Sequence, residues 1–104
     1  VEAWEVAQFA ELIRQLGETP EGDGSLLDHS LVLLSSEISN GNSHSHTNLP
    51  VVLAGRAGGR LETGRHLVVP AGSEYGDMLT SVGEIVGAPM AEFYERGHAP
   101  LAGL

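Results

Sequence analysis

Two short apolar runs, with a polar segment between them, constrain the fold of this chain most strongly. Residues 31–34 and 49–54 are apolar and have the length of strands. A strand that is apolar on both faces is typical of α/β sheets, in which helices cover each side. The polar segment 35–48 is short for a helical crossover, because a parallel return needs roughly a dozen residues or more and usually a helix. A mixed sheet is therefore predicted.

Helical periodicity flanks these runs. Four apolar residues recur at helical spacing near the start of the chain, namely Val6, Phe9, Ile13 and Leu16. This stripe predicts an amphipathic helix over residues 2–16 that ends at Gly17. A second helix is predicted over residues 75–86, with Ser73 as its N-terminal cap. Residues 67–69 are predicted to form a short third strand.

These elements together predict an α/β fold with a small mixed β-sheet flanked by helices. A chain of 104 residues is long enough for one domain, so residues 1–104 are interpreted as a single domain. The tail over residues 90–104 is expected to be loosely ordered. The first residue is Val1 rather than Met, so we expect the chain to be either processed or cut from a longer protein.

The charge of the chain limits the classes of partner that it can bind. The formal net charge is −9, with 14 acidic residues, and all five basic residues are arginines. Such a field repels phosphate backbones, so no nucleic-acid partner is expected, and it attracts divalent cations unless it serves only solubility. No segment approaches the ~20 apolar residues that span a bilayer, so no membrane insertion is expected. Zero cysteines exclude disulfides and Cys-ligated zinc.

Three residues of the polar segment 35–48 are candidate metal ligands. Glu37 follows the first apolar run, at the end of a strand where α/β sheets place ligands. His44 and His46 follow at a spacing that points both imidazoles to one side if the backbone is extended. Carboxylate and imidazole ligands suit Zn²⁺ or Mn²⁺. The alternative interpretation is that all three residues are solvated loop residues.

A second polar loop, residues 55–64, is rich in glycine. Arg56, Arg60, Arg65 and His66 lie in it or at its edge and are candidates for binding phosphate or sulfate. A plain glycine-rich connection is the alternative, because the loop has no P-loop lysine. Asp28 and His29 precede the first run, where a turn role is favoured over metal binding. The serines of the polar segment lack a nucleophile-elbow motif.

Several motifs together resemble a known family. SHTNLPVVLAG at residues 45–55 is similar to the SHTxxPVP segment of cofactor-independent phosphoglycerate mutases, in which the histidine before Thr binds metal. The closest resemblance is to the HXXSHH family of bacterial proteins, in the alkaline phosphatase-like superfamily. It rests on EGDGSLLD at 21–28, GNSH at 41–44, NLPVVLAG at 48–55, GGRL at 58–61 and TGRHL at 63–67. The match runs from the first helix to about Pro89, and the name-giving histidine motif of the family lies upstream of it.

The resemblance implies that the chain is the C-terminal portion of a larger α/β domain and a fragment of an alkaline phosphatase-like three-layer fold. It also implies a metal-dependent hydrolase or transferase that acts on a small anionic phosphate or sulfate ester. It favours His46 as a ligand. The superfamily has an Asp-His pair where this chain has Glu37 and Ile38, so one ligand of a two-metal site is missing. A non-catalytic structural or interaction module with a degenerate site is therefore the alternative. The fragment alone is expected to be inactive, its parent exported, and a homo-oligomer is expected because a partial sheet exposes edges.

Overall fold

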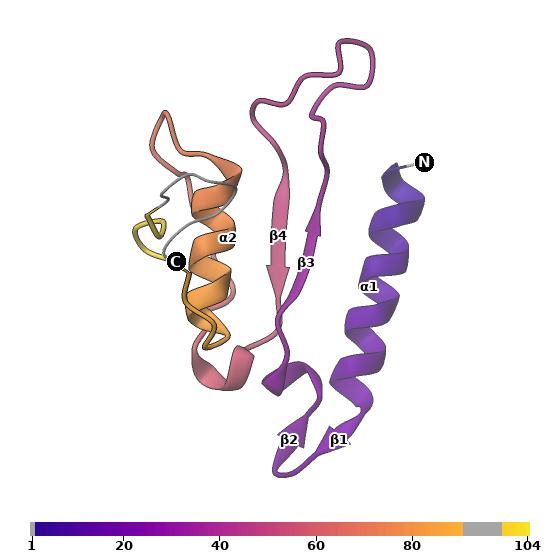
Figure 1. Cartoon of the computed structure of the whole chain (residues 1–104). Helices are drawn as coiled ribbons and strands as arrows, with labels where there is room; N and C mark the ends of the chain where they lie inside the picture. The colour runs from indigo at the N-terminus through magenta and orange to yellow at the C-terminus, as the bar shows by residue number, and fades with distance from the viewer. Residues whose placement is uncertain (1, 91–98) are drawn as a thin grey trace.

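The chain forms helices on either side of a central strand hairpin in its computed structural model, which describes residues 2–90 and 99–104 (Figure 1). The elements in chain order are α1 (Glu2–Glu18), β1 (Pro20–Glu21), β2 (Gly24–Ser25), η1 (Leu27–His29), β3 (Val32–Ser35), β4 (Val51–Ala54), η2 (Ala57–Gly59) and α2 (Tyr75–Ile85). The prediction of an α/β class with helices flanking strands is confirmed at this level.

Strand pairing is antiparallel throughout the described residues. β3 pairs with β4 in a register that runs from Val32 opposite Ala54 to Ser35 opposite Val51, and β1 pairs with β2. The predicted mixed sheet is therefore wrong for this part of the chain. The pairing is antiparallel because the chain returns directly through residues 36–50, and a hairpin without a crossover forces antiparallel pairing.

The predicted third strand over residues 67–69 is also wrong. Residues 67–69 pair with no strand in the described part of the chain, and Val68 is 84% exposed. The strands predicted over residues 31–34 and 49–54 exist as β3 and β4. They are less buried than expected, since β3 is half-buried and Val52 of β4 is 48% exposed. In a two-stranded sheet both strands are edges, so neither is enclosed by neighbours.

Helix α1 extends two residues further than predicted, through Gly17 to Glu18. Arg14 spans the last turns, since its guanidinium donates to the carboxylates of Glu11 and Glu18, each at 2.6 Å. The Thr19 hydroxyl then donates to the Gln15 carbonyl at 2.7 Å. These contacts stabilise the helix beyond Gly17, which was predicted to end it.

The N-cap of helix α2 lies one residue after the predicted cap, Ser73. Glu74 is the N-cap, and its backbone N–H donates to the Asp77 carboxylate at 2.8 Å in a reciprocal capping box. The Ser73 hydroxyl instead donates to the Pro70 carbonyl at 2.7 Å. The helix end is as predicted, because Gly87 has a φ of 83° and the Ala88 N–H donates to the Gly83 carbonyl at 2.7 Å.

Most of the buried residues belong to α2. Leu61, Met78 and Ile85 are the buried hydrophobic residues of the described chain. The tail contacts the same helix, since the Leu101 N–H donates to the Ser81 hydroxyl at 2.7 Å. Residues 91–98 of the predicted loose tail lie outside the described residues, and Leu101 is half-buried. Helix α1, by contrast, leaves Trp4 66% exposed.

Candidate metal-ligand loop

The candidate ligands lie in residues 36–50, which we call the ligand loop, between β3 and β4 (Figure 1). Its tip is held by local hydrogen bonds. The Asn40 side-chain oxygen accepts the N–H groups of Asn42 at 2.9 Å and Ser43 at 3.2 Å. Asn40 forms an isolated bridge with Ser45, and the Ser39 N–H donates to the Ser45 carbonyl at 2.7 Å. The loop therefore folds back on itself before the chain enters β4.

This fold-back places His46 beside the start of the loop. Its ring Nδ1 lies 2.8 Å from the backbone oxygen of Glu37. A carbonyl oxygen can only accept, so the proton of the neutral ring is on Nδ1 and the lone pair is on Nε2. Metal-binding histidines commonly donate their other ring nitrogen to such a carbonyl, which fixes the ring orientation. The His46 ring is exposed, so Nε2 is chemically suited to bind a metal.

The other two candidates are placed differently. His44 is exposed at the loop tip with a left-handed φ of 50°. The Glu37 side chain is also exposed, and its backbone oxygen is the group that contacts His46. No group of three His, Cys, Asp or Glu side chains able to hold a metal is present in residues 2–90 and 99–104. The structure thus joins Glu37 to His46 and leaves the ligand set incomplete within the described chain.

Glu37 and His46 share a surface depression that we call the β3-end depression. Its other lining residues come from β3, the ligand loop and the start of α2, namely Leu33, Leu34, Ser35, Ser36, Leu49 and Tyr75. Tyr75 is the residue that sequence reasoning missed. It is the first residue of the predicted second helix, but no sequence signal connects that helix to the end of β3.

The serines of this region satisfy backbone groups. The Ser35 hydroxyl donates to the Pro50 carbonyl at 2.9 Å, and the Ser36 hydroxyl donates to the Ile38 carbonyl at 2.8 Å. The hydroxyls of Ser45 and Thr47 lie 2.9 Å apart. These contacts agree with the interpretation of the serines as loop residues, because each hydroxyl has a local structural partner.

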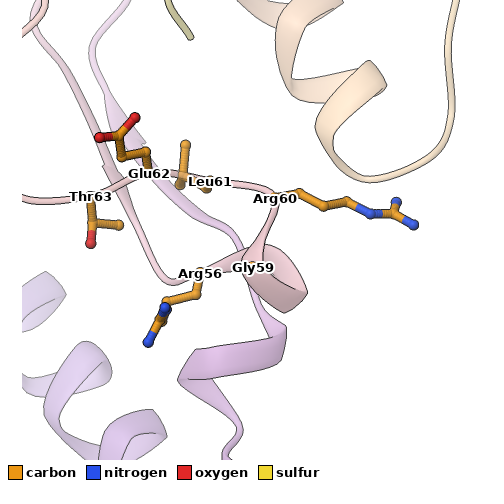
Figure 2. A pocket seen from close by; sticks show the side chains of 6 residues that line it. All are labelled: Arg56, Gly59, Arg60, Leu61, Glu62 and Thr63. Atoms are coloured by element: carbon orange, nitrogen blue, oxygen red, sulfur yellow. The ribbon is translucent and has the colours of Figure 1, made fainter.

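The glycine-rich loop does not gather its cationic groups. Residues of this loop, including Arg56 and Arg60, line a surface hollow. Figure 2 shows that the side chains of these two arginines point in different directions. Arg60 Nη1 donates to the Ile85 carbonyl at 3.4 Å, at the negative end of α2. Arg65 donates to the carbonyls of Glu62 and Gly103, and the His66 side chain is exposed. The arrangement favours the plain connection over a convergent anion site.

The predicted turn role of Asp28 is confirmed. The Ser25 N–H donates to Asp28 Oδ2 at 2.9 Å, and the Asp28 N–H donates to the Ser25 hydroxyl at 3.3 Å. The backbone hydrogen bond from Ser25 is the main reason that the pKa of Asp28 is lowered, and the charge of Arg56 adds to it. His29 Nδ1 lies 3.4 Å from the carboxylate of Glu21. Asp28 precedes β3, whereas the ligand loop follows it, so the two lie at opposite ends of the β3–β4 hairpin.

Comparisons with known proteins identify no family for this chain. No family model, curated protein or solved structure matches this chain. Among the helices of the described chain, none has the length and apolar character needed to cross a membrane.

Proposed function

We propose that this chain is the metal-ligand-bearing C-terminal segment of a metal-dependent phosphate or sulfate ester hydrolase or transferase of the HXXSHH family. In this proposal the parent has an alkaline phosphatase-like three-layer fold. The motifs from residue 21 to residue 67 support the family. The observation that supports the function is the 2.8 Å contact between His46 Nδ1 and the Glu37 carbonyl, because it orients the ring as in metal-binding histidines and keeps Nε2 out of this hydrogen bond.

His46 would be the principal ligand in this proposal. His44 and the Glu37 carboxylate are further candidates, although the described residues bring no three such side chains together. When bound, Zn²⁺ or Mn²⁺ would polarise an ester oxygen as a Lewis acid or would lower the pKa of a bound nucleophile. The remaining ligands and the nucleophile come from another part of the parent protein. The isolated chain is therefore expected to have little catalytic activity.

A specific residue favours a second candidate function. Ile38 is half-buried in the ligand loop, at the position where the superfamily has a metal-binding histidine. Its N–H contacts the Ser36 hydroxyl at 3.3 Å, in a purely structural role. A non-catalytic module with a degenerate site, which holds a structural metal or an interaction surface, fits this substitution. Metal-dependent ester hydrolysis by the full-length parent favours the enzyme, and its absence favours the module.

Metal content tests the proposed ligand loop. The chain, its His46→Ala variant and the His44→Ala/His46→Ala double variant are purified without chelator or histidine tag, incubated with Zn²⁺ or Mn²⁺, and analysed by mass spectrometry. We expect near-stoichiometric metal in the unchanged chain and a loss in both variants. His66→Ala is the matched control, because His66 is an exposed histidine outside the ligand loop. Equal metal in all four proteins, or none in any, contradicts the proposal.

A further inference from the structure

The tip of the ligand loop contains an asparagine followed by a glycine, Asn40 and Gly41, and both residues are exposed to solvent. The Asn40 Oδ1 accepts the N–H groups of Asn42 at 2.9 Å and Ser43 at 3.2 Å. An asparagine side chain that accepts an N–H group two residues ahead forms an Asx turn. In such a turn the side-chain amide folds forward over the peptide bond that follows. The amide carbon Cγ of Asn40 therefore lies over its peptide bond to Gly41.

We propose that Asn40 is a site of spontaneous deamidation, at which the folded chain converts this asparagine to aspartate or isoaspartate with water as the co-reactant. The Gly41 backbone nitrogen loses its proton to a solvent base and attacks Asn40 Cγ. The new bond between nitrogen and Cγ closes a succinimide ring, the bond from Cγ to Nδ2 breaks, and Nδ2 takes up a proton and leaves as ammonia. Water then adds to one of the two ring carbonyl carbons, the bond from that carbon to nitrogen breaks, and the nitrogen regains a proton.

The two N–H groups at Oδ1 favour the first of these steps. Negative charge develops on Oδ1 as the Gly41 nitrogen attacks, because the amide carbon becomes tetrahedral. Donors that already point at this oxygen stabilise that charge, as they do in an oxyanion hole. The Asx turn also holds the carbon close to the attacking nitrogen, and such proximity lowers the entropic part of the barrier. The folded loop is therefore expected to promote ring closure.

Glycine suits the attacking position because it has no side chain to restrict the rotation that ring closure needs. Nothing lies within 4 Å of a Cβ built at Gly41, and its φ is outside the left-handed region. An alanine therefore fits at this position in the folded loop, so Gly41→Ala tests the chemistry and leaves the loop intact. The other two asparagines of the chain are Asn42 and Asn48, and each precedes a residue with a side chain.

Deamidation changes the ligand loop in two ways. Either product adds a carboxylate to a chain whose formal net charge is −9. Isoaspartate also inserts a methylene group into the backbone at Asn40, which forms the bridge with Ser45. The hydrogen bond from the Ser39 N–H to the Ser45 carbonyl belongs to the same closure, so we expect the isoaspartate form to lose it. The inference does not depend on the proposed function, because neither step involves a metal.

Peptide mapping of the aged chain tests the site. The chain and its Gly41→Ala variant are stored at a mildly alkaline pH and then digested with trypsin, which cuts after Arg14 and Arg56 and leaves all three asparagines in one peptide. Mass spectrometry locates the exchange of the amide –NH₂ for –OH, and chromatography separates aspartate from isoaspartate. We expect Asn40 to react about tenfold faster than Asn42 or Asn48, and Gly41→Ala to slow it about tenfold.

The same chain in guanidinium chloride separates the effect of the loop from that of the local sequence. We expect the folded chain to convert Asn40 at least as fast as the unfolded chain, because unfolding removes the Asx turn and its two donors. Circular dichroism checks that Gly41→Ala remains folded. A slower reaction in the folded chain would show that the turn shields the amide, and it would overturn the inference. Equal conversion of the three asparagines, or an unchanged rate in folded Gly41→Ala, would also overturn it.

Discussion

The two ends of the β3–β4 hairpin differ in what holds them. At the end near η1 and η2, backbone groups of distant residues pair directly, with Arg56 N–H donating to the Leu27 carbonyl at 3.2 Å and Ala57 N–H to the Ser30 carbonyl at 2.9 Å. We call this end the turn junction. At the other end, the ligand loop is held by bonds among neighbours such as Asn40 and Ser43.

Side-chain exposure follows the same division. Gly55 is buried at the turn junction, whereas His44 and His46 are exposed in the ligand loop. A close approach of two backbones leaves no space for a ligand, whereas a locally closed loop keeps its imidazoles exposed to solvent. The comparison teaches that the turn junction determines the fold and that the ligand loop is available for binding.

Gly55→Ala should produce the largest effect. Gly55 has a φ of +96°, and a Cβ there would lie 2.2 Å from the Ser30 carbonyl oxygen. Left-handed strain and the backbone clash add, so we expect a loss of about 3 kcal/mol in the free energy of unfolding. Urea denaturation followed by circular dichroism measures the change.

Gly58→Ala is the matched control within the same loop. Gly58 also has a positive φ, +69°, but nothing lies within 4 Å of the Cβ that would be added. The strain term then acts alone, and a loss of about 1 kcal/mol is expected. Equal losses in the two variants would show that the backbone approach at the turn junction is unimportant.

Asp28→Asn should change the acid sensitivity of the turn junction by a smaller amount. The backbone hydrogen bond from Ser25 lowers the pKa of Asp28 below its ordinary value of 3.8 in the folded chain. A lowered folded-state pKa means that the contribution of the carboxylate is fully present above that ordinary value. It is lost as the pH falls through the lower folded-state pKa. The variant lacks this contribution.

Urea denaturation from pH 7 to pH 2 measures the difference. We expect Asp28→Asn to be less stable than the unchanged chain at neutral pH, with the gap closing as the pH falls below 3.8. Asp23→Asn removes the same charge from the exposed hairpin turn between β1 and β2, and serves as the control. A gap that stays constant with pH excludes the Asp28 carboxylate as its source.

The sequence predicts local features of the fold well. Both helices and the β3 and β4 runs were predicted within about two residues of their bounds, because periodicity and apolar runs are properties of neighbouring residues. The end of α2 was predicted within one residue, and Gly87 follows it with a positive φ, a conformation that favours glycine. The turn role of Asp28 was predicted for the same kind of reason, since its partner Ser25 is three residues away.

Features that depend on distant partners were not predictable. Residues 67–69 have the composition of a strand, but a strand forms only where another chain segment pairs with it. Ser73 and Glu74 are both acceptable near a helix start, and the reciprocal contact with Asp77 decides for Glu74. The sequence identified Glu37 and His46 as candidates, but it did not reveal that the contact uses the Glu37 carbonyl or that Tyr75 lies nearby.

His46→Ala should have the smallest effect on the unliganded chain and so sharpens the contrast between the two ends. The imidazole is exposed and its hydrogen bond to the Glu37 carbonyl is at the surface, so a change within about 0.5 kcal/mol is expected. Zinc at 100 times its dissociation constant should stabilise the unchanged chain by about 2.7 kcal/mol and the variant by nothing. Urea denaturation with and without zinc separates the two effects, with His66→Ala as the control. A large loss in the zinc-free variant would place His46 among the residues that hold the fold, and the ligand loop would then share the structural role of the turn junction.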